Sequence, residues 1–177
     1  DTARFGAWCR AETGFPFVDA CLRALEATGW INFRMRAMLM SFASYHLWLH
    51  WRQPALFLAR RFTDYEPGIH YSQSQMQAGT TGINTFRIYN PVKQSIDHDP
   101  TGSFIKKWVP ELANCPKEHI HTPWNMTLLE QQLCGVIINE TYPERIIDHE
   151  EAAREARRKI WAHRSNQLVK TESRRIV

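Results

Sequence analysis

The feature that most constrains the fold of this chain is the pattern of helix starts and stops between residues 13 and 36. Pro16 suits the first turn of a helix, where its missing N–H leaves no hydrogen bond unmade. Gly29 suits the position after the last turn, because glycine readily adopts the left-handed conformation that ends many helices. Between them, apolar side chains recur at helical spacing, at Val18, Cys21, Leu22 and Leu25. This pattern predicts a helix of about four turns, after which Asn32 begins a second helix as its N-cap.

The rest of the chain predicts more helices and almost no strands. Apolar side chains surround the whole circumference of residues 33–51, so this helix is expected to be central and nearly fully buried. A third helix is expected over residues 54–62, a short one over 103–108, and a highly charged surface helix over 150–167. Strand-like alternation is scarce, and the predicted fold class is therefore all-α.

Two segments lack a helical pattern. Residues 63–90 carry breakers and a run of Ser, Gln and Thr, and they predict a long irregular segment. Loops of this length inside compact domains are usually functional, so a functional loop is expected here. Prolines at positions 116, 123 and 143 predict a more extended stretch further along.

Length and composition indicate a folded, soluble domain. A chain of 177 residues with 44% hydrophobic and 23% charged residues can bury a core. Its net charge of +4 permits an anionic partner, although many basic proteins bind no nucleic acid. The longest apolar run, residues 38–51, is interrupted by serines and histidines and is too short to span a membrane. We therefore expect a cytoplasmic protein without a membrane partner.

No metal site is predicted. The four cysteines lack the close spacing of zinc or iron–sulfur sites. His46 and His50 have the i, i+4 spacing that can place two imidazoles on one metal, but no glutamate follows His46 as in metalloproteases. Because both lie among Leu and Trp, they are interpreted as buried histidines with satisfied hydrogen bonds.

Four blocks of this sequence occur in the same order in one known family. They are Thr13–Ala20 with Thr28–Trp30, Arg34 and Arg36; Trp51-Arg52; Phe86–Pro91 with Gln94; and Phe104–Leu112. Together they resemble the later half of the FAD-binding (catalytic) domain of DNA photolyases and cryptochromes, over roughly residues 8–148.

This resemblance implies a division of the chain and an incomplete domain. Residues 1–148 would form a partial FAD-binding helical bundle, and residues 149–177 a charged helix and tail whose charges are most simply a solvated face. The upstream part of the family's chain has no counterpart, so the sequence is either a fragment or a reduced protein. A missing N-terminal half or a partner chain is expected to complete it.

The resemblance also implies a set of flavin-binding residues. Trp30 would pack at the flavin pocket, and Arg36, paired with Asp64, would steady negative charge on the isoalloxazine ring. Glu66 would lie near the pyrimidine edge of that ring, and His70 near its reactive nitrogen as a candidate catalytic residue. From the residues alone, the charged pair could instead be structural, Trp30 part of the core and His70 a solvated side chain.

The residues implied to meet DNA depart from the family's pattern. Phe33, Ala37 and Met76 occupy positions where photolyases carry an asparagine, a methionine and a tryptophan against a flipped pyrimidine dimer. The stacking and polar groups that repay the cost of base flipping are thus reduced, with Phe33 and Met76 left as candidate substrate-binding residues. Three basic residues could contact DNA phosphates or be solvated surface charges: Arg34, Arg87 and Lys93.

The tryptophan relay that reduces the flavin in this family is implied only in part. Trp51 matches its middle member and is the second candidate catalytic residue. Ser74 replaces the member next to the flavin. The relay is therefore broken unless another aromatic residue substitutes, the candidates being Tyr45, Trp48, Tyr71 and Tyr89.

Three functions remain open at this point. The first is an FAD-dependent photolyase-type lyase, in which excited reduced flavin donates an electron to a pyrimidine dimer in damaged DNA. The second is a cryptochrome-like blue-light flavoprotein without repair, in which His70 tunes the reduced state that persists. The third is a helical interaction or nucleic-acid-binding scaffold that has lost the flavin.

Overall fold

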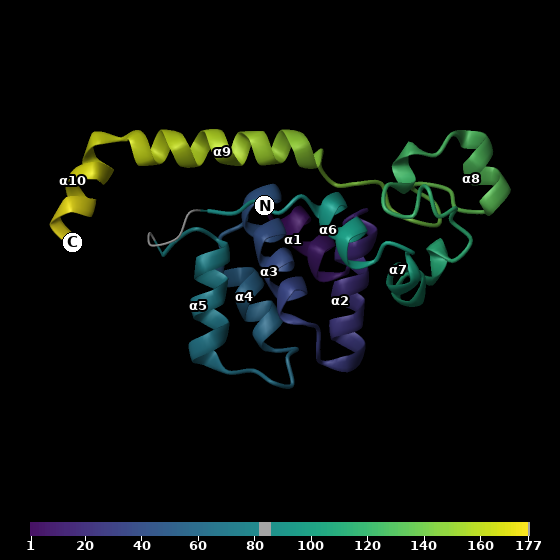
Figure 1. Ribbon diagram of the computed structural model, residues 1–177, viewed down its shortest axis with the longest axis horizontal. Coiled ribbons are helices and arrows are strands. Elements are labelled where there is room, and N and C mark those ends of the chain that lie inside the picture. Colours follow the sequence, from purple (N-terminus) through teal and green to yellow (C-terminus); the bar gives the residue numbers. More distant parts are fainter. Residues whose placement is uncertain (82–85, 177) are drawn as a thin grey trace.

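The computed structural model describes residues 1–81 and 86–176 (Figure 1). Within these residues the secondary structure is helical apart from one isolated bridge between Ile138 and Tyr142, and the predicted all-α class is confirmed. The α-helices are α1 (Thr2–Cys9), α2 (Pro16–Thr28), α3 (Phe33–Ser41), α4 (Arg52–Ala59), α5 (Pro67–Gln77), α6 (Pro91–His98), α7 (Ser103–Trp108), α8 (Leu128–Cys134), α9 (His149–Ser165) and α10 (Gln167–Ile176). A π-helix, η1 (Phe42–His46), continues α3, and two 3₁₀-helices, η2 (Pro110–Leu112) and η3 (Pro123–Asn125), lie in the later half.

Helices α1 to α5 form the body of the molecule (Figure 1). Helix α2 packs on α3, α6 and α7, and α5 packs on α3 and α4. Helix α9 crosses one face of this body over η1, and α10 continues beyond it to the C-terminal end (Figure 1). The core is rich in aromatic side chains that are at most 2% exposed, each burial contributing about 1.5–3 kcal/mol: Trp8, Phe15, Phe17 and Phe42. None of the described helices is both long and apolar enough to cross a lipid bilayer.

The helix starts and stops predicted between residues 13 and 36 are confirmed. Pro16 is the first residue of α2, and Gly29 ends the helix with φ +70°. The side chain of Asn32 caps α3 by accepting a hydrogen bond from the backbone N–H of Met35 at 3.0 Å. Helix α7 also has the predicted bounds, whereas the third predicted helix, expected over residues 54–62, is α4, which begins two residues earlier, at Arg52, and ends three residues earlier, at Ala59.

The prediction of one continuous helix over residues 33–51 is wrong. After Ser41 the backbone widens into η1, where Leu47 N–H donates to Phe42 O at 3.1 Å across five residues. Trp48 then has φ +52°, which a helix cannot contain. As a result, His46 is 2% exposed whereas His50 is exposed, so the two histidines do not share a helix face. The interpretation of both as buried histidines with satisfied hydrogen bonds is therefore wrong, because His50 is not buried and the ring nitrogens of His46 bond to no described residue.

The prediction of an irregular segment over residues 63–90 is also wrong in part, because residues 67–77 form α5. Pro67, read as a breaker, occupies the first helical position, and the Glu66 carboxylate caps the helix by accepting from Gly68 N and Ile69 N at 3.1 and 2.6 Å. The sequence did not predict α5 because its residues are mostly polar and show no apolar helical pattern. The inward face of α5 borders a cavity rather than the core. Residues 82–85 of the same segment lie outside the described residues.

The stretch predicted to be extended after Pro116 contains a further short helix. Thr127 and Glu130 form a reciprocal capping box at the start of α8, and Gly135 ends it in the left-handed conformation. Pro123 begins η3, and Pro116 begins a turn closed by a hydrogen bond from His119 N to its carbonyl at 3.0 Å, whereas Pro143 lies in a stretch without helix or turn.

The first motif of the sequence serves as a structural anchor. The buried Asp19 carboxylate accepts from Thr13 N, Thr13 Oγ1 and Gly14 N at 2.9, 2.7 and 3.2 Å, and from the Tyr142 hydroxyl at 2.6 Å. Gly14 has φ +75°, and a Cβ there would lie 2.4 Å from Arg145 N. The motif thus holds the later part of the chain, at Tyr142 and Arg145, against the start of α2.

Candidate functional site

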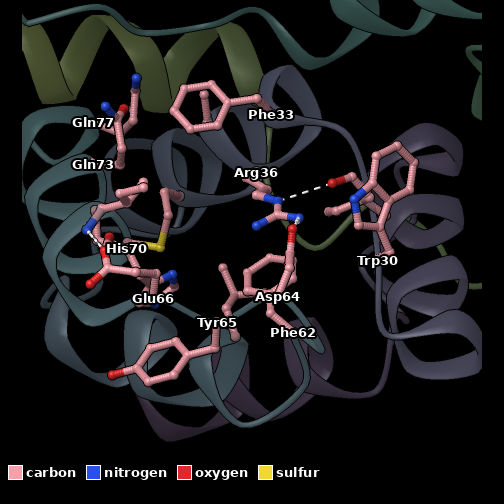
Figure 2. Close-up of a pocket in the computed structure, with 16 residues that line it drawn as sticks. Trp30, Phe33, Arg36, Phe62, Asp64, Tyr65, Glu66, His70, Gln73 and Gln77 are labelled. Atoms are coloured by element: carbon pink, nitrogen blue, oxygen red, sulfur yellow. Dashed lines mark hydrogen bonds and ion pairs between the residues drawn. The ribbon is translucent and has the colours of Figure 1, made fainter.

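A cavity of about 360 Å³ opens between α3, α5 and the segment that joins α4 to α5 (Figure 2). This volume lies in the usual range of roughly 300–1,000 Å³ for small-molecule sites. Figure 2 shows Arg36 and Asp64 on one side and the amides of Gln73 and Gln77 on the other, with Phe33 at the edge between them. The cavity therefore offers an ionic wall and an amide wall around a largely apolar interior.

The ionic wall is held by three interactions of Arg36. Its Nη2 donates to both oxygens of Asp64, at 3.0 and 2.8 Å, and its Nε donates to Ile31 O at 2.9 Å. Its guanidinium carbon lies 4.0 Å from the centre of the Phe62 ring. The hydrogen bonds from Arg36 lower the pKa of Asp64, so the carboxylate stays ionised and the guanidinium stays fixed. Among the described residues, no group bonds to Nη1, which leaves this nitrogen for a ligand.

Glu66 lines the same cavity, but its carboxylate is already engaged as the cap of α5. It thereby sets where α5 begins, and with it the positions of His70, Ser74 and Gln77, which follow at helical spacing on the cavity side.

His70 is held in one tautomer. Its Nε2 lies 2.8 Å from the carbonyl oxygen of Ala55 in α4, and because a carbonyl only accepts, Nε2 carries the hydrogen. In the neutral ring Nδ1 is therefore an acceptor. Burial lowers the pKa of His70 below its usual value, the Ala55 carbonyl opposes this, and Arg36 lowers it further. The ring packs edge-on against Tyr65 and Tyr71.

Trp30 and Phe33 form the open edge of the cavity, with 56% and 52% of their surface exposed. The alternative interpretation of Trp30 as a core residue is therefore excluded by its exposure. Two large aromatic rings beside a cavity give a planar ligand surfaces to stack against.

The cavity does not include every predicted site residue. Trp51, Met76, Arg34, Arg87 and Lys93 all lie outside its lining. Trp51 packs against the core, with its ring 6.0 Å from that of His50, and Lys93 pairs with Asp97 at 3.1 Å. Arg34 and Arg87 are exposed. These positions are compatible with surface contacts but not with direct contact to a ligand inside the cavity.

The residues considered for an electron relay are divided between two regions. Ser74 is buried in the cavity wall, where its hydroxyl donates to His70 O at 2.8 Å, and Tyr71 lies beside His70. Tyr45 and Trp48 lie instead beneath α9, where Trp48 packs under Lys159. The backbone N–H of Tyr89 donates to Ser41 Oγ at 3.3 Å, at the end of α3. Tyr71 therefore packs directly against a cavity residue, His70.

Sequence reasoning missed the amide wall. Gln73 and Gln77 lie one turn apart on α5, and Gln73 Oε1 is buried with no hydrogen-bond partner among the described residues. The signal that could have revealed them is the i, i+3, i+4 recurrence of residues 66, 69, 70, 73 and 77, once residues 67–77 are recognised as a helix.

The all-α fold and the cavity beside α3 and α5 are features of a helical domain of the photolyase type. The sequence model of the FAD binding domain of DNA photolyase matches residues 1–162, and the chain belongs to the DNA photolyase and cryptochrome family.

Known relatives include both branches of the family. The chain is 37% identical to the cryptochrome DASH of Gloeobacter violaceus over 149 residues, which are 84% of this chain and 30% of that protein. It is 38% identical to the deoxyribodipyrimidine photo-lyase of Alkalihalophilus pseudofirmus over 152 residues, which are 85% of this chain and 32% of that protein. The chain thus spans about a third of the length of these relatives.

Solved structures of a photolyase and of a cryptochrome have a similar fold. A class III photolyase from Agrobacterium tumefaciens has a TM-score of 0.88 at 31% identity, over 94% of this chain and 35% of that one. A cryptochrome from Synechocystis sp. has a TM-score of 0.86 at 33% identity, over 89% of this chain and 33% of that one. Photolyases and cryptochromes match this chain equally well. The similarity therefore identifies the family, and it does not distinguish repair from signalling.

Proposed function

We propose that the cavity between α3 and α5 is this chain's share of an FAD site, and that the protein it belongs to uses bound flavin for light-driven electron transfer to pyrimidine dimers in DNA. The single observation that carries the proposal is the Arg36–Asp64 pair, which places a fixed guanidinium with a free Nη1 in the wall of a cavity flanked by aromatic rings.

The hydrogen-bonding groups that line the cavity fit a flavin. An isoalloxazine ring presents carbonyl oxygens and ring nitrogens along its edge, and Arg36, His70 and the two glutamine amides present donors and acceptors around the cavity. The buried, unpartnered Oε1 of Gln73 needs such a partner, because an unmade buried hydrogen bond costs about 1–3 kcal/mol.

Each wall residue has a distinct task in this proposal. A bound reduced flavin excited by blue light supplies the electron. Arg36 keeps a positive charge beside the ring, and Asp64 holds Arg36 in place and limits the net charge of the pocket. His70, fixed by Ala55, offers Nδ1 as an acceptor and can hold a proton when the pH falls.

Helices α3 and α5 exclude water only from the inner part of the site. The edge formed by Trp30 and Phe33 is open in this chain, which spans about a third of its relatives. We infer that the preceding part of the domain, in the same protein or in a partner chain, covers that edge.

A second candidate function is blue-light sensing without repair. It is favoured by the substrate side of the site, where Ala37 is small and Met76 lies outside the cavity lining. Of the three residues that replace the family's substrate-binding groups, Phe33, Ala37 and Met76, only Phe33 offers an aromatic ring against which a flipped dimer could stack, and each stacked base contributes about 1–3 kcal/mol.

The first test is a dark titration of FAD with the purified chain, followed by flavin fluorescence and absorption, using Arg36→Gln and the matched control Arg60→Gln. Arg60 is an exposed arginine outside the cavity, so its loss changes the net charge equally. We expect saturable binding that Arg36→Gln weakens roughly tenfold to a hundredfold and Arg60→Gln leaves unchanged, since a hydrogen bond to a charged group contributes about 1.5–3 kcal/mol. Absence of saturable binding by the native chain would contradict the proposal.

The second test separates repair from sensing. The FAD-loaded chain is reduced, mixed with UV-irradiated oligothymidylate and exposed to blue light, and the loss of dimers is followed by the recovery of thymine absorbance. Light-dependent recovery supports repair, whereas retained flavin without recovery supports the sensing function.

A further inference from the structure

A further cavity, with a polar lining, lies where α9 crosses the body over η1. The segment before α6 runs beneath α9 in Figure 1, and its residues Ile88 and Asn90 line this cavity with His46 of η1. Helix α9 contributes one face, whose members follow at i, i+3, i+4 and i+7: Glu150, Ala153, Arg154 and Arg157. The cavity has a volume of about 240 Å³ and shares no lining residue with the flavin cavity.

The floor of this cavity is a buried imidazole, that of His46. His46 is 2% exposed, its ring stacks on Phe42 with the centroids 5.3 Å apart, and neither Nδ1 nor Nε2 forms a hydrogen bond with any described residue. His149, at the N-terminal end of α9, also has a buried Nδ1 without a partner among the described residues. The π-helical widening of η1 is a backbone irregularity that is frequent at functional sites.

The rim of the cavity is positively charged. Arg154 pairs only loosely with Glu150, at 3.9 Å, and Arg157 has no carboxylate within ion-pair distance among the described residues. Two guanidiniums against one carboxylate leave a net positive charge even when both histidines are neutral. Burial is the main cause that lowers the pKa of His46 to about 4, and the charges of His149 and Arg157 lower it further.

We propose that this cavity binds a phosphate-type oxyanion, with Arg154 and Arg157 pairing its charge and the ring N–H groups of His46 and His149 donating to its oxygens. The two arginines disfavour a metal cation at the same place, and their planar donor forks suit a tetrahedral oxyanion. The volume exceeds that of a single water molecule, which occupies about 30 Å³ in the liquid, so an anion and accompanying waters fit. The site is independent of the flavin cavity and of the function proposed for it.

The test is a titration of the 177-residue chain with inorganic phosphate, followed by ³¹P NMR and by the ¹⁵N resonances of the histidine rings. The variants are Arg157→Gln and His46→Phe, and the matched control is Arg158→Gln. Arg158 follows Arg157 on the same helix, does not line this cavity and is held by Glu155 at 2.7 Å. Since Arg157 is exposed, its replacement leaves the fold intact even if His46→Phe does not.

We expect saturable phosphate binding that shifts the His46 ring resonances. Arg157→Gln should weaken it roughly tenfold to a hundredfold, as expected for one charge-assisted hydrogen bond, and Arg158→Gln should leave it within about twofold. A parallel titration with AMP distinguishes the source, since a nucleotide that binds more tightly than phosphate identifies a nucleotide phosphate, and equal or weaker binding identifies the free anion. Unsaturable binding, an equal effect of Arg157→Gln and Arg158→Gln, or unmoved His46 resonances would each overturn the proposal.

Discussion

Replacing Tyr142 with phenylalanine removes a single atom from the interior, the hydroxyl oxygen that donates to Asp19 at 2.6 Å. Tyr142 is 1% exposed and lies 123 positions along the chain from Asp19, so this bond ties the later part of the chain to α2. The ring itself still fills its place in the core, and no cavity opens. The perturbation therefore isolates one long-range hydrogen bond to a buried carboxyl group.

The expected cost follows from the charge of the acceptor. A hydrogen bond to a charged group contributes about 1.5–3 kcal/mol, whereas a bond to a neutral group contributes about 0.5–1.5 kcal/mol. Burial raises the pKa of Asp19 to about 6, although the bonds from Tyr142 and Thr13 lower it. Above that pH the carboxylate is ionised and the larger value applies. In a domain of this size, the melting temperature should fall by roughly 3–12 °C.

The pH dependence has a definite sign. Because the pKa of Asp19 is higher in the folded state than its usual 3.8, the stability linked to this group is present below pH 3.8 and is lost as the pH rises through about 6. Tyr142→Phe removes a bond that lowers this pKa, so the pKa of Asp19 rises further in the variant. The deficit of the variant should therefore be larger at about pH 8 than at about pH 5.

Urea unfolding followed by far-UV circular dichroism, at both pH values, measures the deficit. Tyr89→Phe is the matched control, because the structure gives the Tyr89 hydroxyl no bond to any described residue, and it should change the free energy of unfolding by less than about 0.5 kcal/mol. If Tyr142→Phe cost no more than the control, or cost the same at both pH values, the reasoning about Asp19 would be refuted.

Three further predictions concern stability. Gly14→Ala should lower the free energy of unfolding, measured with urea, by more than about 2 kcal/mol. A left-handed alanine costs roughly 1–2 kcal/mol, and its Cβ would also lie 2.4 Å from Arg145 N. A decrease smaller than this backbone strain would contradict the close contact between Gly14 and Arg145. Glu66→Ala should lower the free energy of unfolding by about 0.5–2 kcal/mol through loss of the α5 cap, and an unchanged urea midpoint would exclude the capping role. The pKa of His46 is lowered to about 4, so the stability linked to it is present above pH 6.5 and is lost as the pH falls toward 4. His46→Phe should therefore flatten this loss, which is on the order of 2–3 kcal/mol in phosphate-free buffer, and an equally steep loss in the variant would assign it to other groups.

The sequence correctly predicted helix ends that are set by residues at the ends themselves. Pro16, Gly29 and Asn32 act through bonds and dihedral angles within a few residues, and their effect is the same in the folded chain as in a short segment. The Arg36–Asp64 contact was expected only through the family resemblance, since no local rule pairs residues 28 positions apart. The cofactor and DNA roles of the site residues stay predictions.

The sequence by itself determined the fold class, the family, the bounds of α2 and α7 and the start of α3. Only the tertiary structure decided that η1 interrupts the long apolar segment and that a polar stretch becomes α5. It also decided that the ring nitrogens of His46 and Oε1 of Gln73 are buried without partners among the described residues. The physical reason is that helix propensity and capping are local, whereas burial and the pairing of polar groups depend on segments distant in the chain. Tyr142 illustrates the difference, because its meeting with Asp19 follows from the path of the whole chain and from no pattern near either residue.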